Sequence, residues 1–210
     1  STIIDDLGEI VQSNIDIIQN ATVVSLCYYV NDSDRSLSPL VLEKLAVVLT
    51  KQDHELINNV LSIYLKLIKQ KHRVPSTALN RLNTFLTNNK EFELREKSIW
   101  ILKHAADNGE NFEELILKAI DQCLNDQEFS IRNIAANVFI QYWNRQIREN
   151  DLNTIESTLT SRMENVLLFF RNNFDREIQN SALKLIKNLV ENNYKLSDSL
   201  LDLIEYCLYD

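Results

Sequence analysis

Residues 94–107 read LREKSIWILKHAAD, and this stretch decides how the rest of the chain is interpreted. Leu94, Ser98 and Ile101 follow one another at i, i+4 and i+7, which is the spacing that places side chains on one face of an α-helix. Gly109 comes shortly after the stretch, and a glycine after a periodic run is a signal for the end of a helix. The stretch therefore predicts a helix that buries one face and ends before Gly109.

The same spacing returns along the chain at nearly constant intervals. The other triplets are Ile17/Ala21/Val24, Leu56/Val60/Ile63, Ile131/Ala135/Val138 and Ile178/Ala182/Leu185. The first members of successive triplets lie 39, 38, 37 and 47 residues apart. Such a period indicates a helical-repeat protein, in which each helix pair buries its apolar face against the next pair. We therefore expect an all-α fold of about five stacked helix pairs.

Each pair is expected to consist of an outer helix and an inner helix. Ser38-Pro39 and Pro75-Ser76 carry the capping signals of two outer helices. The expected outer and inner ranges are 39–51 with 53–71, 76–88 with 91–107, 112–125 with 127–147, and 154–171 with 175–192. Because no Ser/Gly-rich linker divides the chain, we predict one solenoid domain over 1–210. Its repeat units are expected at about 1–36, 37–74, 75–110, 111–152 and 153–197, with a partial unit at 198–210.

Composition and charge exclude several classes of protein. Two glycines and two prolines are too few for the turns of β-sandwiches or the glycine-rich loops of Rossmann folds. A net charge of −8 repels nucleic acid and anionic membranes, and no apolar run approaches the roughly 20 residues of a membrane-spanning helix. Cys27, Cys123 and Cys207 fit no zinc-ligand spacing, so we expect reduced thiols and a cytoplasmic or nuclear location.

Three of the expected inner helices resemble the armadillo and HEAT repeat families. Residues 131–136, IRNIAA, follow Asn125-Asp126 and are similar to the HEAT pattern of an Asp-containing turn, an aliphatic-Arg pair and small residues. Residues 96–106, EKSIWILKHAA, and 181–190, SALKLIKNLV, resemble the third helix of an armadillo repeat. The resemblance implies a right-handed α-α superhelix of about five armadillo/HEAT-like helix pairs.

The resemblance also implies where a partner would bind. In peptide-binding armadillo proteins, Trp and Asn side chains of successive third helices line the concave groove. Carried over to this chain, the Trp positions become Val23, Ser62, Trp100, Asn137 and Lys184, and the Asn positions become Cys27, Lys66, His104, Gln141 and Asn188. Trp100 and Asn188 keep the family residue. We expect a polar concave strip of Ser62, Lys66, Trp100, His104, Asn137, Gln141, Lys184 and Asn188.

The leading interpretation is a non-catalytic protein-interaction scaffold or adaptor that binds a folded domain or a peptide along this strip. His54, His72 and His104 share no ligand spacing with one another or with a cysteine, so we expect no metal, no cofactor and no enzymatic activity. Insertion into a membrane is not expected either. A stacked solenoid orders its contact residues before binding, which reduces the entropic cost of association.

Two alternatives remain open at this point. The first is a nucleic-acid-binding helical repeat similar to the HEAT-like DNA glycosylases, because cationic residues lie on or near the inner helices: Lys66, Arg73, Lys97, Lys103, Arg132, Lys184 and Lys187. The second is an architectural segment of a larger scaffold, in which the helix expected at 198–210 stacks on further repeats or dimerises. Tyr142-Trp143 adds a third feature, since two adjacent aromatic side chains are not expected to face the core together. We expect one of them either to cover the next repeat or to be an exposed binding anchor.

Overall fold

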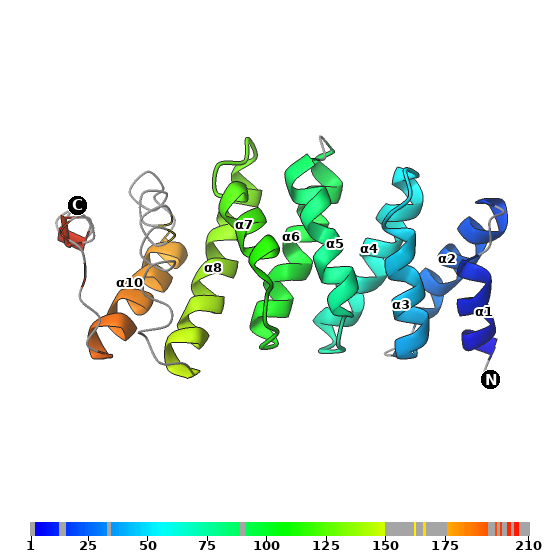
Figure 1. The fold of residues 1–210 in the computed structure, drawn as a ribbon, viewed down its shortest axis with the longest axis horizontal. Coiled ribbons are helices and arrows are strands. Elements are labelled where there is room, and N and C mark those ends of the chain that lie inside the picture. Colours follow the sequence, from blue (N-terminus) through cyan, green and yellow to red (C-terminus); the bar gives the residue numbers. More distant parts are fainter. Residues whose placement is uncertain are drawn as a thin grey trace. The chain divides into compact units, whose positions relative to one another are not determined.

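The computed structural model describes residues 3–12, 16–32, 35–88, 91–149, 162, 166, 176–192, 196, 198, 201–202 and 204–205. Every regular element within these ranges is a helix (Figure 1), so the all-α prediction is confirmed. The helices are α1 (Ile3–Val11), α2 (Asp16–Asn31), α3 (Pro39–Val48), α4 (His54–Lys69), α5 (Ser76–Asn88), α6 (Phe92–Asp107), α7 (Glu114–Cys123), α8 (Phe129–Glu149) and α10 (Arg176–Glu191).

The chain forms two compact units. One comprises Ser1–Asn108 with Phe112–Ala119, and the other comprises Gly109–Asn111 with Ile120–Asp210. In the first unit, α2, α4 and α6 pack on one another as an inner layer, and α1, α3 and α5 pack as an outer layer. Contacts between α1 and α2, α3 and α4, and α5 and α6 join the layers. In the second unit, α8 packs against α10. This is the predicted arrangement of outer and inner helices.

The helix boundaries follow from local signals in the sequence. Ser38 Oγ accepts a hydrogen bond from the Val41 amide at 3.4 Å, and Asp53 Oδ1 accepts one from the Leu56 amide at 3.0 Å. Both side chains satisfy amide groups that the first turn of a helix leaves without an intrahelical partner. Gly109 has φ +85°, a conformation that glycine adopts without steric cost. The predicted starts of α3 and α4 and the predicted end of α6 are therefore confirmed.

The predicted buried stripe is present in three inner helices. Leu94, Ser98 and Ile101 are fully buried in α6. The triplets of α4 and α8 are buried in the same way, and consist of Leu56/Val60/Ile63 and Ile131/Ala135/Val138. In α10, Leu185 is buried. The period that the sequence showed is therefore the period of core packing.

The stripe predicted for α2 is wrong. Ile17 is 81% exposed and Val24 is 37% exposed, whereas Val23 and Leu26 are fully buried. Apolar side chains occur all round α2, so several stripes with the same spacing fit the sequence and spacing alone cannot choose between them. Val23 therefore belongs to the core. It does not line a binding surface, although the family resemblance implied that it would.

The alternative of an exposed binding anchor at Tyr142 or Trp143 is also wrong, because both side chains are buried. Tyr142 is 7% exposed and Trp143 is 5% exposed. The Trp143 ring lies 5.9 Å from the Phe139 ring, and the Arg145 guanidinium covers the Tyr142 ring at 5.7 Å. Adjacent positions on a helix differ by about 100°, so a helix that is covered on two sides buries both.

Two predictions concern residues outside the described ranges. The outer helix expected at 154–171 falls there except for Arg162 and Val166, which are helical and buried. Of the helix expected at 198–210, residues 198, 201–202 and 204–205 are described and are helical. Cys207 also lies outside the described residues, while neither Cys27 nor Cys123 is in a disulfide.

Close packing between α1 and α3 depends on Gly8. A Cβ atom built on Gly8 would lie 2.6 Å from Val41 Cγ2, which is closer than two carbon atoms can approach. Around this contact, the Lys44 ammonium of α3 forms an ion pair with Glu9 of α1, and Ser38 Oγ donates a hydrogen bond to Asp5 Oδ1 at 2.8 Å. Gly8 thus lets the first two outer helices approach each other.

We predict that Gly8→Ala destabilises the protein. Alanine in a helix normally stabilises by about 0.5–1 kcal/mol relative to glycine, but overpacking against Val41 is expected to cost about 1–3 kcal/mol. Urea unfolding followed by circular dichroism measures the difference. Val41→Ala removes the methyl group that the new Cβ would contact. In a Val41→Ala background, Gly8→Ala should therefore lower the free energy of unfolding by less than it does in the wild-type protein. A stabilising effect of Gly8→Ala would contradict the close approach.

Candidate protein-binding site

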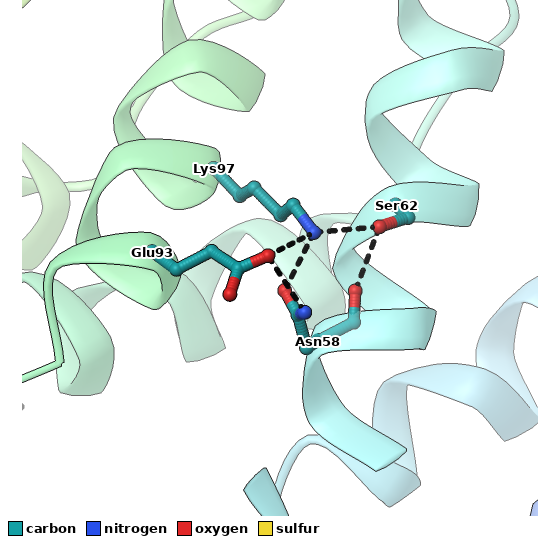
Figure 2. A network of polar contacts seen from close by, with 4 residues as sticks. All are labelled: Asn58, Ser62, Glu93 and Lys97. Carbon is teal, nitrogen blue, oxygen red and sulfur yellow. Dashed lines mark hydrogen bonds and ion pairs between the residues drawn. The ribbon is translucent and has the colours of Figure 1, made fainter. Parts of the chain in front are cut away.

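The polar faces of α4 and α6 meet in a network around Lys97 (Figure 2). The Lys97 ammonium donates to Asn58 Oδ1 at 2.6 Å, to Ser62 Oγ at 2.9 Å and to Glu93 Oε1 at 3.0 Å. Asn58 Nδ2 also donates to Glu93 Oε1 at 2.8 Å. All three donor positions of the ammonium are therefore occupied, and the network ties one inner helix to the next.

Glu93 is the anionic member of this network. Hydrogen bonds from Asn58 and Lys97, together with the positive charge of Lys97, lower the pKa of the Glu93 carboxyl from its ordinary value. Each of these contacts favours the carboxylate over the neutral acid. Because the pKa in the folded state is lowered, the contribution of Glu93 to stability is present at neutral pH and is lost as the pH falls through its folded-state pKa.

Further along α6, Trp100 and His104 form a half-buried aromatic pair. Their rings are stacked with centroids 5.8 Å apart and planes 23° from parallel, and the Lys103 ammonium lies 6.0 Å from the centre of the Trp100 ring. His104 Nδ1 lies 3.8 Å from Asp107 Oδ2. Among the described residues, no hydrogen-bond partner reaches the buried His104 Nε2.

His104 is held in its neutral form more firmly than a free histidine. Partial burial, and then the positive charge of Lys103, lower the pKa of His104 from its ordinary value, and Asp107 opposes the shift. At neutral pH the imidazole is therefore uncharged, with one ring nitrogen that can donate and one that can accept a hydrogen bond. Beside Trp100 it forms a surface that is flat, aromatic and only weakly polar.

In the second unit, side chains of α8 and α10 line a pocket that is open to solvent. Its volume is about 350 Å³, and it is lined by Ile140, Gln141, Asn144, Arg148, Lys184, Lys187, Asn188 and Glu191. The α8 residues follow one another at steps of one, three and four, and the α10 residues at steps of one and three. Each set therefore lies on one face of its helix. The pocket is a direct product of helical spacing on two neighbouring inner helices.

An amide pair lies in the pocket wall. Asn188 Nδ2 donates to Asn144 Oδ1 at 2.7 Å, and the side chain of Asn188 is half-buried. This contact leaves Asn144 Nδ2 able to donate a hydrogen bond and Asn188 Oδ1 able to accept one. One donor and one acceptor in the same pocket wall match the carbonyl and N–H groups of a peptide backbone.

The structure groups the expected strip residues differently in the two units. In the first unit Ser62 is bound to Lys97, Trp100 stacks on His104, and Lys66 is half-buried on α4. In the second unit Gln141, Lys184 and Asn188 line the same pocket. Asn137 does not line it, because its side chain donates to the Asn133 carbonyl of its own helix at 3.2 Å.

Sequence reasoning missed several residues of these sites. Asn58 lies one turn before Ser62, and Glu93 lies two turns before Trp100. Asn144 and Arg148 lie one and two turns after Gln141. Helical spacing of three, four and seven residues from the expected positions could have indicated them. Their pairing across helices could not be read from spacing, since it depends on how neighbouring helices are offset along their axes.

Two further findings concern the described residues alone. They contain no group of three or more His, Cys, Asp or Glu side chains placed to hold a metal ion. No described helix is long and apolar enough to cross a membrane.

Comparison with known proteins rests on structure alone. No family model and no curated protein matches the sequence. A designed armadillo repeat protein in complex with the peptide (KR)4 has a TM-score of 0.54 and 12% sequence identity, with 99% of this chain and 98% of that chain covered. The fold is that of an armadillo-like helical repeat.

Two more solved structures agree with this fold. Computationally designed armadillo repeat proteins for modular peptide recognition have a TM-score of 0.58 and 13% identity over 87% of this chain and 80% of that chain. An engineered protein from a structural genomics programme has a TM-score of 0.62 and 14% identity over 98% of this chain and 51% of that chain. At such low identity the likeness concerns the armadillo-like architecture.

We predict that Lys97→Met weakens the first unit. Methionine keeps the length of the side chain but removes the hydrogen bonds to Asn58, Ser62 and Glu93. The expected loss is about 1–2 kcal/mol in the free energy of unfolding, since hydrogen bonds to a charged group contribute about 1.5–3 kcal/mol and solvent reaches Glu93. Urea unfolding measures it. Lys118→Met, at an exposed lysine of α7, is the matched control and should stay within about 0.5 kcal/mol.

We predict that the pKa of His104 lies below about 6.5, the ordinary value for histidine. Because the unfolded chain then binds a proton more readily than the folded one, stability is lost as the pH falls from about 6.5 toward the folded-state pKa. Titration of the His104 ring signals by NMR measures the shift. Lys103→Gln should raise this pKa, because it removes a neighbouring positive charge. A pKa above 6.5 in the wild-type protein would mean that Asp107 dominates.

Proposed function

We propose that the protein is a non-catalytic scaffold or adaptor that binds a partner protein through the polar faces of its inner helices. The single observation that carries this proposal is the pocket between α8 and α10, where Gln141, Lys184 and Asn188 come together around an amide pair. Armadillo-like folds among the solved structures include proteins designed for modular peptide recognition. The pocket supplies the polar groups that such recognition needs.

The inner helices hold these groups in place before a partner arrives. α8 is anchored by buried side chains along most of its length, among them Ile131, Ala135 and Ile147. The Asn144–Asn188 hydrogen bond then fixes the two amide groups across the pocket. Little side-chain freedom remains to be lost on binding at these positions, which favours affinity.

Contacts of the cationic residues favour a protein partner over nucleic acid. Lys97 and Lys103 are paired with Glu93 and Asp107 on their own helix. Arg132 donates to the carbonyl oxygens of Asp126 and Gln127, which fixes the turn before α8. These charges are already occupied within the chain, and phosphate binding would have to displace their partners. Cys27 and Cys123 are not in disulfides, which suits an adaptor of the reducing cytoplasm or nucleus.

Affinity capture from the source cell with paired variants tests the proposal. Gln141→Ala and Lys184→Ala change exposed side chains of the pocket, and Trp100→Ala changes the aromatic pair of the first unit. Arg81→Ala and Lys118→Ala, at exposed positions of α5 and α7, are the controls. We expect at least one protein to be retained by wild type and controls and to be lost, at equal helicity by circular dichroism, from the pocket variants. A partner lost only from the controls would place the binding surface on the outer helices.

A further inference from the structure

The charge of the α8–α10 pocket is opposite to that of the whole chain. The chain has a net charge of −8, but the side chains that line the pocket include Arg148, Lys184 and Lys187 against the single carboxylate of Glu191. Lys187 Nζ lies 3.6 Å from Glu191 Oε1, so these two charges largely cancel. Arg148 and Lys184 are left to set the charge of the pocket.

Neither of these two cations has an anionic partner in the described part of the chain. Arg148 donates through Nε to the carbonyl oxygen of Asn144 at 3.1 Å, which orients the guanidinium and leaves its terminal nitrogen atoms available. Lys184 lies on α10, one turn before Asn188, and is exposed. Two unneutralised cations thus lie on opposite helices of one pocket.

The polar groups between the two cations are suited to a peptide. The hydrogen bond from Asn188 Nδ2 to Asn144 Oδ1 leaves Asn144 Nδ2 as a donor and Asn188 Oδ1 as an acceptor in the same pocket wall. A peptide group carries one acceptor and one donor, whereas a phosphodiester carries only acceptors. The volume of about 350 Å³ lies near the lower end of ligand pockets, about 300–1,000 Å³, and accepts a short segment of chain.

We propose that this pocket recognises an acidic segment of a partner protein, with Arg148 and Lys184 binding Asp or Glu carboxylates and the Asn144–Asn188 pair binding the peptide backbone between them. The inference rests on the proposed function and adds the chemical class of the partner. Carboxylates fit an arginine and a lysine through charge-assisted hydrogen bonds. The net negative charge elsewhere on the chain then disfavours acidic segments away from the pocket, and so confines binding to it.

Fluorescence anisotropy with a labelled (DE)4 peptide tests the inference on the full chain. The same measurement with (KR)4 and with a labelled oligothymidylate of eight nucleotides compares opposite charge and a phosphate backbone. We expect (DE)4 to bind more tightly than either, and its affinity to fall as salt is added, because screening weakens exposed charge pairs.

Charge-reversal variants locate the binding site. Lys184→Glu and Arg148→Glu should each weaken (DE)4 binding by about tenfold or more, since each replaces an attraction by a repulsion. Lys118→Glu makes the same change of charge on α7, outside the pocket, and should leave the affinity within about twofold. Asn188→Leu should weaken (DE)4 without changing the charge. Circular dichroism verifies that each variant keeps its helicity.

Each other outcome overturns the inference in a distinguishable way. Equal binding of (DE)4 and (KR)4, both lost in Asn188→Leu, would mean that the pocket binds peptides without preference for acid, and the proposed function would stand. Tighter binding of oligothymidylate would make the pocket a phosphate site. Binding of (DE)4 that is insensitive to Lys184→Glu and Arg148→Glu would place it elsewhere. If no peptide binds, the inference of an acidic segment fails. The adaptor function is then tested independently by the capture experiment with Gln141→Ala.

Discussion

The structure depends on the burial of two stripes of side chains along each central inner helix. In α4 both stripes are buried. One stripe consists of Leu56, Val60, Ile63 and Leu67, and the other consists of Ile57, Leu61, Tyr64 and Ile68. A single helix pair cannot cover this much apolar surface, so the pairs have to stack. What remains for polar side chains is one narrow face. Because the stripes repeat with the chain, the polar faces of successive inner helices repeat with them.

The same polar face has different chemistry in the two units. Between α4 and α6 it is closed by the Lys97 ammonium, whose donors all point to neighbouring side chains and stabilise the stack. Between α8 and α10 it is open, and an amide pair and two cations line a pocket. The polar face of the inner helices therefore stabilises the stack in the first unit and lines an open pocket in the second. The difference follows from which side chains carry charge and whether nearby side chains satisfy it, as Glu93 of the same helix and Asn58 and Ser62 of the neighbouring helix do for Lys97.

The expected binding residues came from single positions, and the sites consist of pairs. Gln141, Lys184 and Asn188 line the pocket as a group because α8 and α10 lie side by side, while Asn137 bonds back to its own helix. Asn144 and Arg148 share the helical face of Gln141, so periodicity was sufficient to indicate their direction. Periodicity could not indicate that Asn144 meets Asn188 across 44 residues of sequence, because that contact depends on the axial offset of two helices.

The sequence by itself determined the described helices, the helix ends at Ser38 and Gly109 and the core stripes of α4, α6 and α8, because helical spacing and capping are local properties of the chain. Tertiary structure decided the burial of α2, where Ile17 is exposed and Val23 is buried although both are apolar and helical. It also decided that Tyr142 and Trp143 are both covered, and which cations remain unpaired. These features depend on what lies against each face of a helix. That information is contained in the packing of neighbouring repeats and in no short stretch of residues.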